Sequence, residues 1–169
     1  MPRNAFDDLM GSANAALLVV TTAVDDVRAG CLVGYHAQAS MDPQHYSFWL
    51  SKANHTYRVG LLATHFAVHF LTAHDHDMAV HFAAQSGQDT DKFADIAVET
   101  GDHSLPYVTA LPNRMVLERI SVLDDGGDHV CVTARVVAAE SDEHFTPLRL
   151  TDVGDVQPAH PPEERIIQP

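Results

Sequence analysis

The chain has 169 residues, 46% of them hydrophobic and 20% charged, which is typical of one globular domain with a single sizeable core. Its formal charge of −13 argues against nucleic acid and anionic membrane surfaces as partners, because both select for clustered basic residues and the ten here are scattered. Since no apolar run is long enough to cross a bilayer and the first ten residues do not resemble a signal peptide, we expect a cytoplasmic protein.

The first part of the chain predicts short strands joined by turns. A β-branched run follows an amphipathic lead-in, and a Met-Asp-Pro break separates two later apolar runs, since Pro43 supplies no backbone donor. Gly30 and Gly34 allow another backbone or a flat ligand to approach closely. The patterns predict a lead-in at Ala5–Asn14, a turn at Val24–Arg28, and strands at Ala15–Thr22, Arg28–Ser40 and Tyr46–Leu50.

The later part alternates short helices, strands and polar loops, and it ends in a proline-rich stretch. Asp124-Asp125-Gly126-Gly127 predicts a hairpin turn, because Asp and Gly tolerate the positive φ of tight turns. The predicted helical segments are Tyr57–Thr64, Asp75–Gln85 and Asp91–Phe93, the loops are Ser86–Asp91 and 101–112, and the strands are His65–Leu71, Met115–Leu123, His129–Ala139 and an edge strand at Phe145–Leu150. Tandem short strands indicate a barrel or sandwich in one domain, residues 1–152, followed by an extended tail, 153–169.

The loop Ser51–Thr56 concentrates two hydroxyls, an ammonium and an amide ahead of a predicted helix. Main-chain N–H groups, hydroxyls and one Lys can hold a phosphate without a metal. An ordinary capped helix after a strand, with Thr56 or Asn54 as the N-cap, explains the same residues and stays open at this point.

Four separated motifs together resemble the flavin reductase-like family, over roughly residues 10 to 140. They are Gly30–Pro43, Ser51–Val59, Asp91-Lys92-Phe93 and Gly127-Asp128-His129-Val130. The resemblance implies a mainly β protein, an FMN-binding split β-barrel of Greek-key-like topology with about six strands and a few short helices.

The resemblance also implies which residues meet the cofactor. Residues Val33, Gly34, Tyr35, His36, Ala37, Gln38 and Ser40 would follow the isoalloxazine, and Ser51, Lys52, Ala53, Asn54 and Thr56 would hold the phosphate. Lys92 and Phe93 would lie near the flavin or the nicotinamide. His129 would face the flavin and stabilise negative charge on it, as the catalytic candidate.

The function implied is hydride transfer from NADH or NADPH to FMN, with FAD as an alternative, in a homodimer that could serve a flavin-dependent monooxygenase. No Gly-x-Gly-x-x-Gly follows a strand, so the nicotinamide donor would bind over the flavin in an open groove. The main alternative is a flavoprotein that keeps FMN tightly and carries electrons with little oxidation of NAD(P)H.

A third alternative is a histidine-rich metal protein, because the chain has 12 His. His65 and His69 would share a helix face and could bind zinc, but the Phe and Val residues around them favour a strand, so we expect no metal site. We expect His74 and His76 in an exposed loop. Cys31 and Cys131 are too few for a disulfide framework, and both are expected to be buried, reduced thiols.

Overall fold

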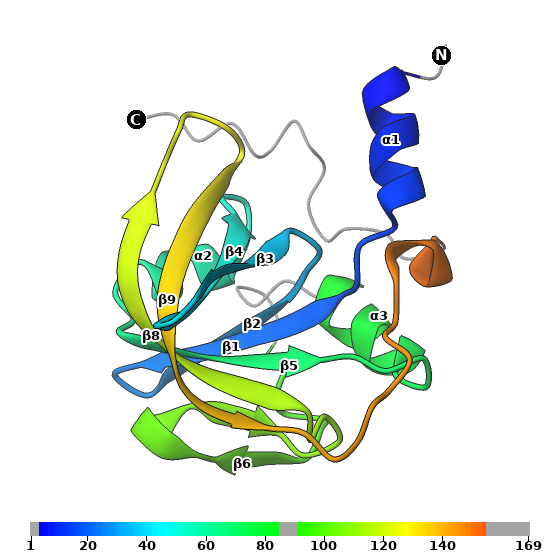
Figure 1. Cartoon of the computed structure of the whole chain (residues 1–169). Coiled ribbons are helices and arrows are strands. Elements are labelled where there is room, and N and C mark those ends of the chain that lie inside the picture. Colours follow the sequence, from blue (N-terminus) through cyan, green and yellow to red (C-terminus); the bar gives the residue numbers. More distant parts are fainter. Residues whose placement is uncertain (1–3, 85–90, 155–169) are drawn as a thin grey trace.

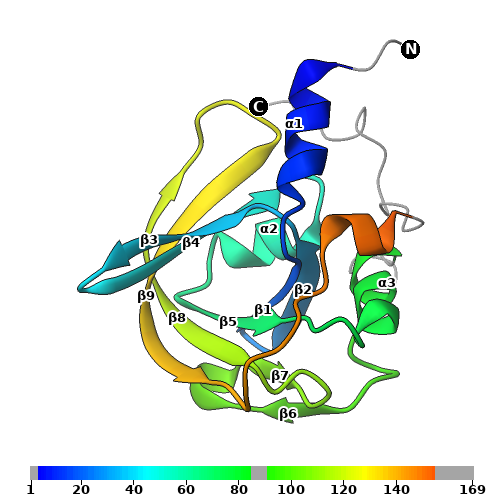
Figure 2. The same ribbon diagram turned by 45° about the vertical axis from the view of Figure 1, so that its right-hand side comes forward.

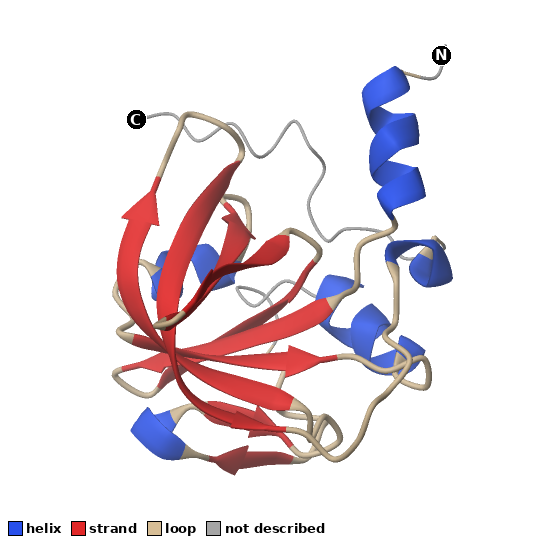
Figure 3. Cartoon of the chain, in the orientation of Figure 1, coloured by secondary structure: helices blue, strands red, loops and turns tan. Residues whose placement is uncertain are grey.

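The computed structural model describes residues 4–84 and 91–154, in which antiparallel strands predominate and the helices are short (Figures 1 and 3). In chain order the elements are α1 (Ala5–Ala13), β1 (Leu18–Val24), β2 (Val27–Val33), β3 (His36–Met41), β4 (Gln44–Ser51), α2 (His55–Gly60), β5 (His65–Phe70), α3 (His76–Ala84), β6 (Val98–Thr100), the 3-10 helix η1 (Asp102–Ser104), β7 (Pro106–Val108), β8 (Arg114–Leu123), β9 (His129–Glu140) and the 3-10 helix η2 (Leu150–Val153).

Seven of the strands form one sheet, in the order β2-β1-β5-β8-β9-β4-β3, and β6 pairs with β7 in a small second sheet. The edge strands β2 and β3 follow each other in the chain, joined only by Gly34 and Tyr35. The N–H of Trp49 in β4 donates to the carbonyl of Tyr35 at 2.9 Å. The sheet therefore curls until its two edges meet, and the resulting barrel is seen from a second side in Figure 2. The predicted mainly β barrel fold is confirmed.

Strand β1 is apolar on both faces because each face meets a separate core. Leu18 and Val20 join the cluster inside the barrel, around Phe48 and Phe66. Leu17, Val19 and Phe82 belong to a second cluster between the barrel wall and α3. Successive side chains of a strand point to opposite faces, so a strand buried on both sides shows a continuous apolar run.

Some predicted boundaries differ from the structure. The predicted strand Arg28–Ser40 is two strands, because the chain turns at Gly34 and Tyr35 to cross from one sheet edge to the other. The predicted helix Tyr57–Thr64 begins earlier, at His55, and ends at Gly60. Strands β6 and β7 were missed, since three residues are too few to show alternation. Together with the split of the predicted strand Arg28–Ser40, they raise the strand count among the described residues from the predicted six or so to nine.

The C-terminal part also differs. The predicted edge strand Phe145–Leu150 makes isolated bridges only, pairing Pro147 with Thr72 and Arg149 with Ala16. Val153, predicted to start the tail, lies in η2 and is buried in the second cluster. The triplet Asp91–Phe93 forms a non-helical turn. The remaining predicted tail, the loop residues 86–90 and Gln85 lie outside the described residues.

Helix α1 projects from the barrel (Figures 1 and 2) and contributes no buried residue. Asn4 caps it, since its side-chain oxygen accepts the N–H of Phe6 at 2.8 Å. Its apolar side chains Phe6, Leu9 and Met10 are largely exposed. Among the described helices, none is long and apolar enough to cross a membrane.

Candidate functional site

The pairing of β4 with β9 brings two loops together at one end of the barrel. Ser51, the last residue of β4, lies opposite His129, the first residue of β9. The loop after β4 therefore runs beside the turn before β9. The backbone N–H of Lys52 donates to the carbonyl of Asp128 at 2.9 Å and ties the two loops to each other.

A pocket of about 220 Å³ opens beside these loops, where the ends of β2, β4 and β9 meet. Six predicted site residues line it: Val33, Gly34, Tyr35, Ser51, Asn54 and His129. Four lining residues were missed by sequence reasoning: Leu17, Leu32, Trp49 and Leu150. Strand alternation puts Trp49 on the same side of β4 as Ser51, so only Trp49 had a signal in the sequence. The pocket combines apolar walls with a polar end.

The predicted residues of β3 leave this pocket. The ring of His36 is fixed inside the protein, with Nε2 donating to the carbonyl of Ala16 at 2.7 Å and Nδ1 lying 2.6 Å from the hydroxyl oxygen of Tyr46. Burial lowers the pKa of His36. Ala37 and Gln38 are exposed on the edge strand and Ser40 is half-buried there. Of the stretch predicted to follow the isoalloxazine, Val33–Ser40, only the first three residues line the pocket.

The loop after β4 is ordered by its own hydrogen bonds. The hydroxyl oxygen of Ser51 accepts the N–H of Ala53 at 3.3 Å, and Asn54 is the N-cap of α2 without a side-chain capping bond. Thr56 is buried with its hydroxyl against the Cys31 thiol. Because α2 has only six residues, an anion seat here depends on the loop and its side chains more than on the helix.

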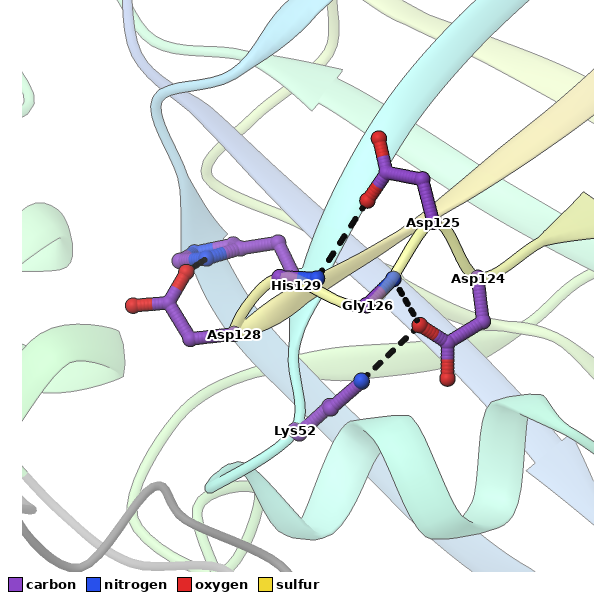
Figure 4. Close-up of polar contacts among 7 residues, drawn as sticks. Lys52, Asp124, Asp125, Gly126, Asp128 and His129 are labelled. Atoms are coloured by element: carbon purple, nitrogen blue, oxygen red, sulfur yellow. Dashed lines mark hydrogen bonds and ion pairs between the residues drawn. The ribbon is translucent and has the colours of Figure 1, made fainter.

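Lys52 is the cation of this loop, and it already has an anionic partner (Figure 4). Its Nζ donates to Oδ1 of Asp124 at 2.9 Å, with the Lys52 side chain 14% and the Asp124 side chain 50% exposed. The same Oδ1 accepts the N–H of Gly126 at 2.9 Å. The bond from Lys52, followed by the bond from Gly126, lowers the pKa of Asp124. The carboxylate therefore stays charged at neutral pH.

His129 lies at the other side of the same turn. Its Nδ1 is 2.7 Å from Oδ1 of Asp128, and its ring is 4.8 Å from the ring of Tyr35 at a tilt of 53°. The carboxylate favours the tautomer with the proton on Nδ1. Tyr35 and His129 together form an aromatic rim on the pocket.

Lys92 and Phe93, predicted to meet the ligand, are buried in the protein. The ammonium of Lys92 donates to the carbonyls of Gly30 and Phe82, each at 2.9 Å, and burial lowers the pKa of Lys92. A Cβ on Gly30 would lie 3.0 Å from the ring of Phe82 and 3.1 Å from that of Phe93. Gly30 therefore makes room for core rings and not for a ligand, and Lys92 supports the strand below the loop.

The histidine pair considered for zinc is divided between two environments. His65 is on β5 at the barrel surface, its ring stacked on that of His103 at 3.6 Å. His69 is fully buried, with Nδ1 donating to the carbonyl of Val19 and Nε2 accepting the N–H of Val108. Both ring nitrogens of His69 are thus occupied. No group of three or more His, Cys, Asp or Glu within residues 4–84 and 91–154 is placed to hold a metal ion.

Predictions about the exposure of four other side chains can be compared with the structure. His74 is exposed as predicted, whereas His76 is half-buried at the start of α3. Cys31 is buried and Cys131 only partly so, and both thiols are free. Burial raises the pKa of Cys31, and Lys92 opposes that shift.

The residues of the pocket suit a flat aromatic ligand with an anionic tail. Val33, Trp49 and Leu17 offer apolar contact to a ring, and Ser51 and Asn54 offer polar groups at one end. Lys52 follows Ser51 directly and can meet negative charge beyond that end. In the described chain the pocket lining itself contains neither Lys nor Arg.

Comparison with known proteins gives consistent matches over most of the chain. The family model described as "Flavin reductase like domain" matches residues 10–156. The chain is 26% identical over 135 residues to the FMN reductase (NADH) SmoA of Agrobacterium fabrum, covering 80% of this chain and 75% of that protein. It is also 26% identical over 148 residues to the reductase component of the flavin-dependent trigonelline monooxygenase of Acinetobacter baylyi, covering 87% of this chain but 44% of that protein.

Among solved structures, a flavin reductase domain protein from Arthrobacter sp. FB24 is similar in fold. The TM-score is 0.76 at 19% sequence identity, and the match covers 86% of this chain and 88% of that chain. At this identity the similarity supports the barrel fold.

Proposed function

The chain belongs to the flavin reductase-like family, and from this premise we propose that it is an NAD(P)H:flavin oxidoreductase that binds FMN. FAD is the alternative flavin, and NADH or NADPH is the electron donor. The similarity to SmoA, named as an NADH-dependent FMN reductase, and to a monooxygenase reductase component supports this activity and a role beside a monooxygenase. When bound, the flavin ring system supplies the chemistry, accepting hydride from the nicotinamide.

The observation that carries the proposal is the pocket between β2, β4 and β9 with Lys52 beside it. Apolar walls next to a hydroxyl, an amide and one ammonium match the parts of FMN, a flat ring system and a phosphate. The candidate phosphate ligands are Ser51, Lys52, Asn54 and the loop N–H groups around Ala53. The side chains of Thr56 and Asn54 both contact the Cys31 thiol, so each would have to leave it to reach the phosphate.

We assign positioning roles to the rest of the pocket. The backbone from Val33 to Tyr35 would lie against the ring edge, and Trp49 would pack on its apolar part. His129, oriented by Asp128, would face the flavin and stabilise the negative charge that the flavin gains on reduction. Lys92 and Phe93 would act from below by fixing β2, since the ammonium of Lys92 holds the carbonyl of Gly30.

We also propose that two copies of the chain complete the site. A pocket of about 220 Å³ is smaller than the roughly 300 to 1,000 Å³ of typical ligand sites, so it encloses only part of a flavin. Tyr35 at its rim is 61% exposed, and the apolar side chains of α1 have no cover in one copy. The two cysteines are free thiols, and a reducing compartment keeps thiols in this state. This supports a cytoplasmic location.

An anaerobic titration of FMN-loaded protein with NADH, and separately with NADPH, tests the activity. We expect rapid loss of flavin absorbance with at least one donor, and the faster one identifies the preferred nucleotide. Bound FMN that is not bleached would indicate the electron-carrier function instead. Absence of flavin binding would refute the proposed function.

A matched pair of variants tests the role of His129. His129→Asn should slow the bleaching step, whereas His74→Asn removes an exposed histidine that does not line the pocket and should leave the rate unchanged. Equal rates for both variants would remove His129 from the mechanism.

A further inference from the structure

The ammonium of Lys52 carries a single positive charge, and the protein itself already supplies an anion for it in the carboxylate of Asp124. We propose that Asp124 competes with the flavin phosphate for Lys52 and thereby keeps FMN an exchanging substrate instead of a resident prosthetic group. The inference rests on the proposed function, because it concerns the same flavin site.

The competition follows from the strand register. Because Ser51 pairs with His129, the turn that precedes β9 must lie over the loop that follows β4. The hydrogen bond from the N–H of Lys52 to the carbonyl of Asp128 fixes this contact. The side chain of Lys52 then reaches Asp124 at 2.9 Å across the two loops (Figure 4). The strand register of the barrel therefore places Lys52 and Asp124 next to each other.

The turn that contains Asp124 positions its carboxylate to bind Lys52. Its Oδ1 accepts the N–H of Gly126 as well as the ammonium, and Gly126 has a φ of 94°, which a side chain would strain. Since the carboxylate is charged at neutral pH, it does not release Lys52 by protonation in that range. An incoming phosphate must displace it or share the ammonium with it against the repulsion between the two anions, and Asp125 and Asp128 add like charge nearby.

Other cations near the loop are poor substitutes for Lys52. Lys92 is buried, with its ammonium bound to the carbonyls of Gly30 and Phe82. Arg58 is exposed on α2 and is not a pocket residue. With a formal charge of −13 on the chain, the availability of Lys52 sets how firmly a dianionic phosphate is held.

The test compares FMN with riboflavin, which has the same ring system but no phosphate, by flavin fluorescence titration of the full chain. Asp124→Asn keeps an oxygen that can accept the N–H of Gly126, so the turn is preserved. We expect FMN to bind roughly two- to five-fold more tightly, the range for a partly exposed ion pair, with riboflavin unchanged. The dissociation rate of FMN, measured by stopped flow, should fall by a similar factor.

Two further variants distinguish competition for Lys52 from a general electrostatic effect of removing one negative charge. Asp125→Asn removes the same charge from the next residue, whose carboxylate accepts the N–H of Gly127 instead of an ammonium. It should change FMN affinity less than Asp124→Asn does. In a Lys52→Ala background, Asp124→Asn should give no gain in affinity, because the contested ammonium is gone.

The possible results are distinguishable. Unchanged or weaker FMN binding by Asp124→Asn, an equal gain for riboflavin, or an equal gain in Asp125→Asn would each overturn the competition while leaving the reductase function intact. If the unaltered protein bound neither FMN nor riboflavin, the proposed function itself would fail, and the competition with it.

Discussion

His69 provides a test of the barrel core through the pH dependence of stability. The residue is fully buried in β5, and its two hydrogen bonds require the neutral ring with the proton on Nδ1. A second proton on Nε2 would face the N–H of Val108 and break that bond. Burial, only partly opposed by the bond to Val19, lowers the pKa of His69 from 6.5 to about 4.

The sign and size of the effect follow from this shift. The unfolded chain takes up the proton near pH 6.5 and the folded chain only near pH 4, so stability is complete above the first value and is lost as the pH falls toward the second. Over the whole window the loss is about 3.4 kcal/mol, and between neutral pH and pH 5 it is about 2 kcal/mol. This is a large part of a typical folding free energy.

Urea unfolding of the unaltered protein and of His69→Gln, each near neutral pH and near pH 5, measures the effect. Glutamine can still donate and accept but does not titrate. We expect the unaltered protein to lose about 2 kcal/mol more than the variant over this interval. Equal losses would refute the assignment of a neutral, buried ring. Should the variant be too unstable, NMR titration of the His69 ring provides the same test, since it should not titrate before the protein unfolds.

Three other predictions concern packing and assembly. Gly30→Ala should lower the free energy of unfolding by about 1 to 2 kcal/mol, because its Cβ would press on the rings of Phe82 and Phe93; an unchanged urea midpoint would contradict this packing. Lys92→Met should lower it by about 1 to 3 kcal/mol, by removing the buried ammonium that donates to two carbonyls, as chemical denaturation would detect. Removing residues 1–13, and with them helix α1, which contributes no buried residue within one copy, should weaken the proposed dimer in light scattering and leave the circular dichroism of the barrel unchanged.

The long strands were predictable because their patterns are local. The runs that became β8 and β9 extend over 10 and 12 residues, and the turn between them carries Gly126 where a positive φ is needed. The crossing at Gly34 and Tyr35 was not visible, because the residues on both sides of it are compatible with one extended strand. Only the closure of the sheet requires a break there.

The pocket was predictable only in part, because sequence patterns report on residues that are neighbours in the chain. Val33, Ser51 and His129 belong to motifs that can be read in the sequence, and the structure brings them together. Leu17 and Leu150 lie far from those motifs in the chain. They reach the pocket because the C-terminal segment returns past the start of β1, where the carbonyl of Leu148 accepts the N–H of Leu17 at 2.9 Å. Nothing in their neighbouring residues indicates this return.

Lys92 illustrates why charge alone does not identify a ligand cation. In the sequence, Lys52 and Lys92 are equivalent candidates for an anionic cofactor, since each lies in a motif of the resembling family. The fold separates them: Lys92 is 7% exposed with its ammonium bound to backbone carbonyls, whereas Lys52 is bound to a carboxylate half exposed to water. A carbonyl partner inside the core cannot be displaced without opening the barrel, but a surface carboxylate can exchange with a phosphate. Of the two ammonium groups, only that of Lys52 can therefore change partner when a ligand arrives.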